Sequence, residues 1–246
     1  MVDARRLVAG VVLAGASAVG VAVGVTIQAA PAGATTVAES SASTLYKDAL
    51  ATTHSWSVHY DSTSTESNET LIESGDAGPA SATQTVTMGQ GTISILVFGG
   101  LSYIKGNTDG LESLAGFSSS QASQGAGQWI EFSTDNTAFA PVVEGVRSAD
   151  IAKELALEVP LSLGKTRTLD GQGVDAIDGT QTFGKKSDHV VLYVRARGTH
   201  VPVEEDSVNA KGQRTDAEHI VYSKWGERVR PQAPKAILSI GSISAV

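Results

Sequence analysis

The sequence predicts an α+β protein built on a curved antiparallel β-sheet of roughly ten strands, with helices packed on one face. Short stretches in which apolar and polar residues alternate run through most of the chain, as expected for strands with one buried face. Turn-forming segments rich in Gly, Asp and Asn separate them, and short turns join antiparallel neighbours. No long helical crossover separates the strands expected between residues 56 and 105, so the parallel sheet of an α/β protein is not expected.

The first 34 residues have the layout of an export signal. Arg5 and Arg6 precede Leu7–Ile27, which carries no charge, and Ala32-Gly33-Ala34 closes the segment like a cleavage site. Cleavage is expected after Ala34. Because ~20 apolar residues can also span a bilayer, a retained anchor with membrane contact through residues 7–27 is the alternative. Both interpretations place the rest of the chain outside the cytoplasm.

Composition excludes several classes of function. The chain of 246 residues has a formal net charge of −8, which argues against a nucleic-acid partner, because such proteins present a basic face to phosphates. It contains no cysteine, so disulfides, cysteine-bound metals, thiol nucleophiles and cysteine-linked lipids are all excluded.

The region after the export segment opens with a tether and a helix. Residues 35–43 are rich in Ser, Thr and Ala and are predicted to form a flexible tether. A single domain is expected over residues 44–246, and its first element is predicted to be a helix over Thr44–Thr53. Trp56, Val58 and Tyr60 then alternate with polar residues, which predicts that all three lie on the buried face of one strand.

The remaining strands and helices are predicted from the spacing of apolar residues and from turn-forming residues. Thr92–Phe98 is apolar on both faces, so both faces are expected to be covered. A short helix is expected at Leu111–Phe117, a loop at Ser118–Gly127 and a longer helix over Phe139–Leu157, stopped by Pro160. His200–Thr215 is expected to be irregular, and Asp178-Gly179 to be a turn. The other strands are expected at Glu69–Glu73, Ala82–Met88, Ser102–Lys105, Gln128–Phe132, Thr166–Leu169, Val174–Thr182, Val190–Ala196, Ile220–Lys224 and Arg228–Val229.

Four motifs carry a resemblance to a known family: Ser102-Tyr103-Ile104-Lys105-Gly106, Gly127-Gln128-Trp129-Ile130-Glu131, Asp170-Gly171-Gln172-Gly173 with Ile177-Asp178-Gly179, and Ile220-Val221-Tyr222-Ser223-Lys224-Trp225. In these and in the order of its elements, the chain resembles the LolA-like fold and, within it, the LppX/LprG-like lipoproteins of the mycobacterial cell envelope. The resemblance covers most of residues 44–240. It implies an actinobacterial envelope protein: a half-barrel whose concave side, closed by the N-terminal helix and one or two central helices, holds the acyl chains of lipids. Such proteins typically carry a lipid-anchoring cysteine after the signal peptide, which this chain lacks.

No catalytic, metal or cofactor site is predicted. The five histidines show no helical metal-site spacing, although a zinc site assembled from distant strands stays open. Gly171-Gln172-Gly173-Val174-Asp175-Ala176 fits a dinucleotide-binding pattern, but a strand is expected after it, so a hairpin is favoured. The candidate ligand-lining residues are apolar or aromatic: Trp56, Val58, Tyr60, Ile93, Ile95, Val97, Tyr103, Val146, Leu155 and Leu192.

The leading hypothesis is an exported, non-enzymatic protein that holds an apolar ligand, such as a lipid, in the concave side of the sheet. The alternative is an extracytoplasmic interaction or sensor module on the same scaffold, with no small ligand. A carrier should contain an apolar cavity of several hundred Å³, a sensor a filled interior with an exposed apolar patch, and an enzyme titratable groups that converge in a cleft.

Overall fold

The computed structural model describes residues 35–66, 69–183, 186–209 and 217–243. The predicted export signal or membrane anchor, residues 1–34, lies outside these described residues. Within them, no helix has the length and apolar character needed to cross a membrane.

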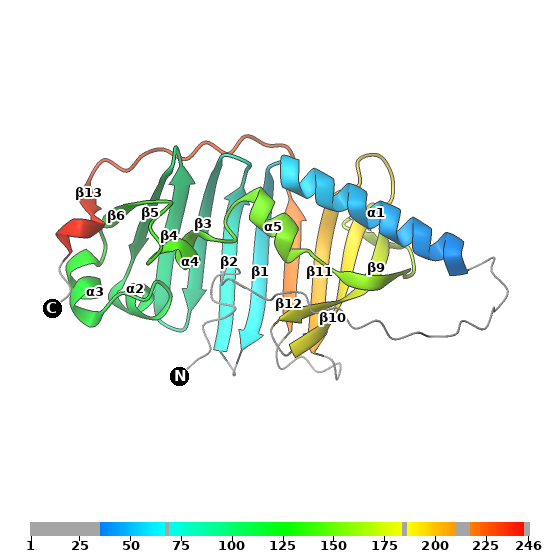
Figure 1. The fold of residues 1–246 in the computed structure, drawn as a ribbon, viewed down its shortest axis with the longest axis horizontal. Coiled ribbons are helices and arrows are strands. Elements are labelled where there is room, and N and C mark those ends of the chain that lie inside the picture. Colours follow the sequence, from blue (N-terminus) through cyan, green and yellow to red (C-terminus); the bar gives the residue numbers. More distant parts are fainter. Residues whose placement is uncertain (1–34, 67–68, 184–185, 210–216, 244–246) are drawn as a thin grey trace, which may run out of the picture.

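A single open, curved sheet of 13 strands forms the body of the described chain, and the helices lie on its concave face (Figure 1). Its order is β13-β6-β5-β4-β3-β2-β1-β12-β11-β10-β9-β7, with β8 paired to β9. Neighbours are antiparallel, except that β13 runs parallel to β6. The strands are β1 Val58–Glu66, β2 Glu69–Ala77, β3 Ser81–Met88, β4 Gly91–Phe98, β5 Leu101–Gly106, β6 Trp129–Ser133, β7 Glu158–Leu163, β8 Arg167–Leu169, β9 Gln172–Phe183, β10 Lys186–Arg195, β11 Pro202–Asn209, β12 Glu218–Ser223 and β13 Ile237–Ser239.

The helices divide between the two ends of the sheet. Figure 1 shows α1 over the end that contains β9–β11, and α2 and α3 beside β5 and β6 at the other end. α4 and α5 cross the middle. Their bounds are α1 Thr35–Ser55, α2 Thr108–Ser113, α3 Ser119–Gly125, α4 Ala140–Val143 and α5 Ser148–Glu154.

Two separate apolar clusters fill the concave face. The first cluster packs β2–β6 against α2–α4, and it comprises Leu71, Ala82, Val86, Ile93, Ile95, Val97, Ile104, Leu111, Leu114, Ala115, Phe117, Ala122, Ile130, Phe132, Val142, Val146 and Ile243. The second cluster packs α1 and α5 against the other half of the sheet, and it comprises Ala42, Tyr46, Ala49, Val58, Tyr60, Ala77, Ile151, Leu155, Leu161, Ile177, Leu192, Val194 and Tyr222.

The fold class and the helix-covered concave face are as predicted, but the strand count is higher. β7, β11 and β13 were not predicted, and no strand forms at Arg228–Val229. β11 lies in the segment His200–Thr215, which was expected to be irregular. Its inward positions include Glu205 and Ser207, so the polar alternation concealed a strand that is buried on one face.

Three local predictions about helices are wrong. The expected loop at Ser118–Gly127 contains α3, because the Ser118 hydroxyl accepts from the Gln121 backbone N–H and the Gln121 side chain accepts from the Ser118 N–H. The expected helix over Phe139–Leu157 is two short helices, interrupted near Gly145, whose φ is +82°. Pro160 lies inside β7 rather than stopping a helix.

One turn predicted from the sequence does not form. Asp178-Gly179 lies inside β9 and forms no turn. The turn between β8 and β9 uses Asp170 and Gly171, which both have positive φ, of 46° and 79°. β9 follows directly, so the hairpin interpretation of the glycine pattern at residues 171–176 is confirmed.

The start of β1 corrects the prediction for Trp56. α1 extends from residue 35, inside the segment expected to be a tether, through Ser55, so the first strand begins only at Val58. Val58 and Tyr60 are buried on the concave face as predicted, whereas Trp56 is 41% exposed in the connection.

β4 is completely covered on one face only. Ile93, Ile95 and Val97 have at most 1% of their surface exposed, beneath the first cluster's helices. Leu96 and Phe98, on the convex face, are only half-buried. The prediction that both faces are fully covered is therefore wrong, and partial cross-strand packing against Tyr103 is enough to explain the apolar residues there.

Tyr46 ties α1 to the segment after α5. Its hydroxyl donates to the Leu155 carbonyl oxygen at 2.8 Å and accepts from the Leu157 N–H at 2.5 Å. Replacing Tyr46 by Phe leaves both backbone groups without this partner, so we expect a loss of about 1–3 kcal/mol in the free energy of unfolding. Urea denaturation of the two proteins measures it; a loss below about 0.3 kcal/mol would show that water replaces the hydroxyl at no cost.

Candidate functional site

The predicted ligand-lining residues do not share one cavity. Ile93, Ile95, Val97 and Val146 belong to the first cluster. Val58, Tyr60, Leu155 and Leu192 belong to the second. Tyr103 is buried, but it pairs with Leu96 on the convex side and stacks on Phe98 with ring centroids 5.3 Å apart. Trp56 is exposed.

A polar pocket lies between the two clusters on the concave face. We call it the acidic pocket, and its lining is Tyr60, Ser62, Glu73, Gln84, Glu144, Gly145, Ile151, Glu154, Glu218, Ile220 and Tyr222. Its volume is about 30 Å³. This is room for about one or two water molecules, and far below the several hundred Å³ of a site for a drug-sized ligand.

Successive side chains of a strand point to opposite faces of the sheet, so every second side chain of the middle strands lies on the concave face. On β1, Ser62 lies between Glu73 of β2 and Ile220 of β12, and one pair further along Tyr60 lies opposite Tyr222. Gly75 faces Tyr60 across β1 and β2, and a Cβ at Gly75 would stand 2.9 Å from the Tyr60 hydroxyl oxygen. The absence of a side chain at residue 75 therefore makes room for the phenol beside the pocket.

The opposite wall comes from residues 140–155, which we call the cover segment. Val142 and Val146 pack into the first cluster, whereas Ile151 and Leu155 pack into the second. Between these anchors, the cover segment contributes Glu144, Gly145, Ile151 and Glu154 to the pocket. It therefore bridges both clusters over the acidic pocket.

Hydrogen bonds hold three carboxyl groups in and beside the pocket. The Gln84 Nε2 donates to Glu73 Oε1 at 3.1 Å, and the Ser62 hydroxyl donates to Glu218 Oε1 at 3.2 Å. The Tyr222 hydroxyl donates to Glu205 Oε2 at 3.4 Å, which places Glu205 immediately behind the pocket wall.

The carboxyl groups of Glu73, Glu154 and Glu205 hold their protons more tightly than glutamates in water. Burial, followed by the charge of Glu218, raises the pKa of Glu73 from 4.5 to about 8. The same two causes raise the pKa of Glu205 to about 8. Burial, followed by the charges of Glu73 and Glu218, raises the pKa of Glu154 well above 4.5. Near neutral pH Glu73 and Glu205 are therefore mostly protonated.

Three polar atoms of the pocket residues lack a partner among the described residues. They are the Tyr60 hydroxyl, Gln84 Oε1 and Glu154 Oε1, all inaccessible to solvent. Tyr60 and Gln84 are each only 6% exposed. Burial raises the pKa of Tyr60 well above 10.0, so its hydroxyl keeps its proton. Since unpartnered buried polar atoms are costly, the pocket is suited to an occupant that forms hydrogen bonds.

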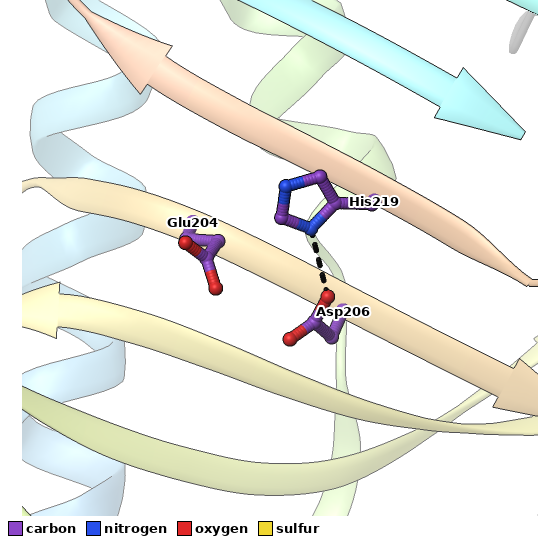
Figure 2. A group of neighbouring side chains, drawn as sticks. All are labelled: Glu204, Asp206 and His219. Atoms are coloured by element: carbon purple, nitrogen blue, oxygen red, sulfur yellow. Dashed lines mark hydrogen bonds and ion pairs between the residues drawn. The ribbon is translucent and has the colours of Figure 1, made fainter. Parts of the chain in front are cut away.

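A second polar group lies on the convex face. Glu204, Asp206 and His219 form the one set of metal-type ligands found within the described part of the chain (Figure 2). His219 Nδ1 and Asp206 Oδ1 are 2.8 Å apart, and Arg167 Nη2 lies 2.5 Å from Glu204 Oε1. Each carboxylate thus already has a protein partner, and the surface ion pairs explain this group without a metal ion.

Sequence reasoning missed the glutamates because it sought apolar residues on the inward face. A signal was present: Leu71, Glu73 and Gly75 alternate with outward residues on β2, so Glu73 shares the face of Leu71. The contributions of Glu154 and Glu218, which are distant in sequence, depend on the tertiary fold.

Comparison with solved structures identifies the fold. LprF from Mycobacterium bovis, an LppX/LprG-family lipoprotein, superposes with a TM-score of 0.52 at 12% identity, covering 79% of this chain and 97% of LprF. The MucA/MucB complex of Pseudomonas aeruginosa matches at a TM-score of 0.42 and 13% identity, covering 84% and 61%. An outer-membrane lipoprotein-sorting protein domain from Vibrio parahaemolyticus matches at 0.29 and 8%, covering 75% and 92%. No protein-family model and no curated protein sequence matches this chain. The chain has the LolA-like fold of LprF, which confirms the predicted resemblance at the level of fold.

Proposed function

We propose that this protein is an extracytoplasmic, non-enzymatic carrier that binds an apolar ligand, such as a lipid, between the concave face of the sheet and the cover segment. The observation that carries the proposal is the placement of two apolar clusters under one short, glycine-interrupted cover. The LolA-like fold and the export segment predicted at residues 1–34 support the location.

Binding requires the cover segment to move. The pocket of about 30 Å³ is too small for an acyl chain, so an apolar ligand has to displace Val142 and Val146, or Ile151 and Leu155, from the clusters. Gly145 lies between these two pairs and has a φ of +82°, so it provides a point at which the two halves of the cover separate.

A single cysteine in the cover segment tests this proposal. The chain has no cysteine, so Glu144→Cys in the full chain can be labelled selectively with an environment-sensitive dye. We expect a single-chain lysophospholipid, added below its micelle concentration, to shift the dye emission with saturation at one ligand per protein. The displaced cover changes the surroundings of residue 144.

The matched control is Thr85→Cys, on the exposed convex face of β3. Its label should not respond to the same lipid. If neither label responds while circular dichroism shows a folded protein, and native mass spectrometry of the wild type detects no bound lipid, the carrier function is refuted.

One observation favours the alternative, an interaction or sensor module. Two packed apolar clusters occupy the concave face, as expected for a scaffold that binds a protein rather than a small ligand. The two proposals differ in the labelling experiment: a sensor with a fixed interior gives no lipid response at residue 144, yet binds a protein partner in solution.

A further inference from the structure

We propose that the acidic pocket binds the primary ammonium group of an amphiphilic ligand, whose apolar part lies along the second cluster. This inference rests on the carrier function and names the polar group that the carrier selects. It starts from the chemistry of the lining, which contains carboxyl, amide and hydroxyl groups but no Lys, Arg or His among the described residues.

The unpartnered atoms of the pocket call for hydrogen-bond donors. Gln84 Oε1 and Glu154 Oε1 are acceptors without a partner among the described residues. The carboxyl of Glu73 has one donor, the Gln84 amide, and can accept more. An ammonium group offers three donors and no acceptor, so it can serve these three groups together.

Size and charge fit the same occupant. A volume of about 30 Å³ accommodates a group of the size of water, which is also the size of an ammonium nitrogen with its hydrogens. A cation placed among Glu73, Glu154 and Glu218 favours the ionised form of these carboxyl groups over the protonated form, so the cluster becomes an ion site once occupied.

The apolar part of the ligand has a continuous path from the pocket. Ile151 lines the pocket and belongs to the second cluster, and Ile220 lines the pocket and packs against that cluster. Tyr60 and Tyr222 also belong to both. An alkyl chain that leaves the ammonium group therefore meets the second cluster before it meets water.

The test compares three ligands with the same chain length: dodecylammonium, dodecanol and dodecanoate, at pH 7 and physiological ionic strength. Isothermal titration calorimetry of the unlabelled full chain measures the binding of each ligand, so that Glu144 stays in the pocket lining. We expect dodecylammonium to bind at least about tenfold more tightly than dodecanol, and dodecanoate to bind most weakly, because it brings an anion to a pocket of acceptors.

Variants identify the pocket as the site. Glu73→Gln and Glu154→Gln keep the side-chain shape, and we expect each to abolish the preference for dodecylammonium over dodecanol while dodecanol still binds. The control is Glu69→Gln on the same strand as Glu73, at an exposed position, which should keep the preference. Thermal unfolding confirms that each variant is folded.

The outcomes separate this inference from the carrier function. Equal affinity for dodecylammonium and dodecanol, or a preference that survives both pocket variants, overturns the ammonium site and leaves a pocket that holds water only, with the carrier intact. Failure of all three ligands and of the lysophospholipid refutes the carrier function itself, and the ammonium site with it.

Discussion

Raising the pH from 5 to 8 is expected to destabilise the protein steeply. Glu73 and Glu205 have a pKa of about 8 in the folded state, against 4.5 for an unperturbed glutamate. Between these values the folded protein binds more protons than the unfolded chain, so the free energy of unfolding falls as the pH rises. Each glutamate contributes a slope of up to about 1.4 kcal/mol per pH unit in this window, and none below it.

Urea denaturation at several pH values measures this slope. The double variant Glu73→Gln/Glu205→Gln should be less sensitive to pH across the window, because it lacks two of the three buried carboxyl groups whose pKa is raised, while Glu154 remains. The matched control is Glu69→Gln/Glu112→Gln at two exposed positions, which should retain the wild-type slope. A wild-type stability that is flat or rises from pH 5 to 8 would show that these carboxyls are not buried as described.

The second large effect is a contrast between adjacent residues of β4. Ile95 has 0% of its surface exposed in the first cluster, so Ile95→Ala leaves a cavity and should cost about 2–5 kcal/mol. Leu96, the next residue, is only partly covered on the convex face, and Leu96→Ala should cost roughly 1 kcal/mol.

Both values come from urea denaturation, and an unchanged m-value confirms that the unfolding reaction is the same in both variants. Equal losses for Ile95→Ala and Leu96→Ala would mean that both faces of β4 are equally covered. That result would contradict the one-sided burial and restore the prediction made from the sequence.

The sequence predicted those strands of the sheet in which apolar inward residues alternate with outward residues. β3 and β4 show this, because Ala82, Val86, Ile93 and Ile95 mark the inward face directly. β11 was missed because its inward side chains include Glu205 and Ser207, which carry no hydrophobic signal. Pattern reasoning detects apolar burial, whereas buried polar residues become visible only when their neighbours are known.

The same blindness of sequence patterns to buried polar residues explains why the candidate site was not predicted. Eight of the ten predicted lining residues are buried on the concave face, yet they belong to two separate clusters instead of lining one cavity. The division arises from Glu73, Glu154 and Glu218, which lie on three elements that only the fold brings together. Glu154 closes the pocket because the predicted single helix is interrupted near Gly145, a backbone detail that helical periodicity did not reveal.

The order of strands also determines how the chain folds. β1 pairs with β2 through a local hairpin, but its other neighbour is β12, and the bonded side chains of Ser62 and Glu218 are 156 residues apart in sequence. Because closing so long a loop costs conformational entropy, we expect this pairing to form late, after the meanders β1–β6 and β9–β12 have formed separately. The acidic pocket lies over this late seam, with Glu73 on one side and Glu218 on the other. The pH effect should therefore appear mainly as faster unfolding in stopped-flow experiments, with the refolding rate nearly constant.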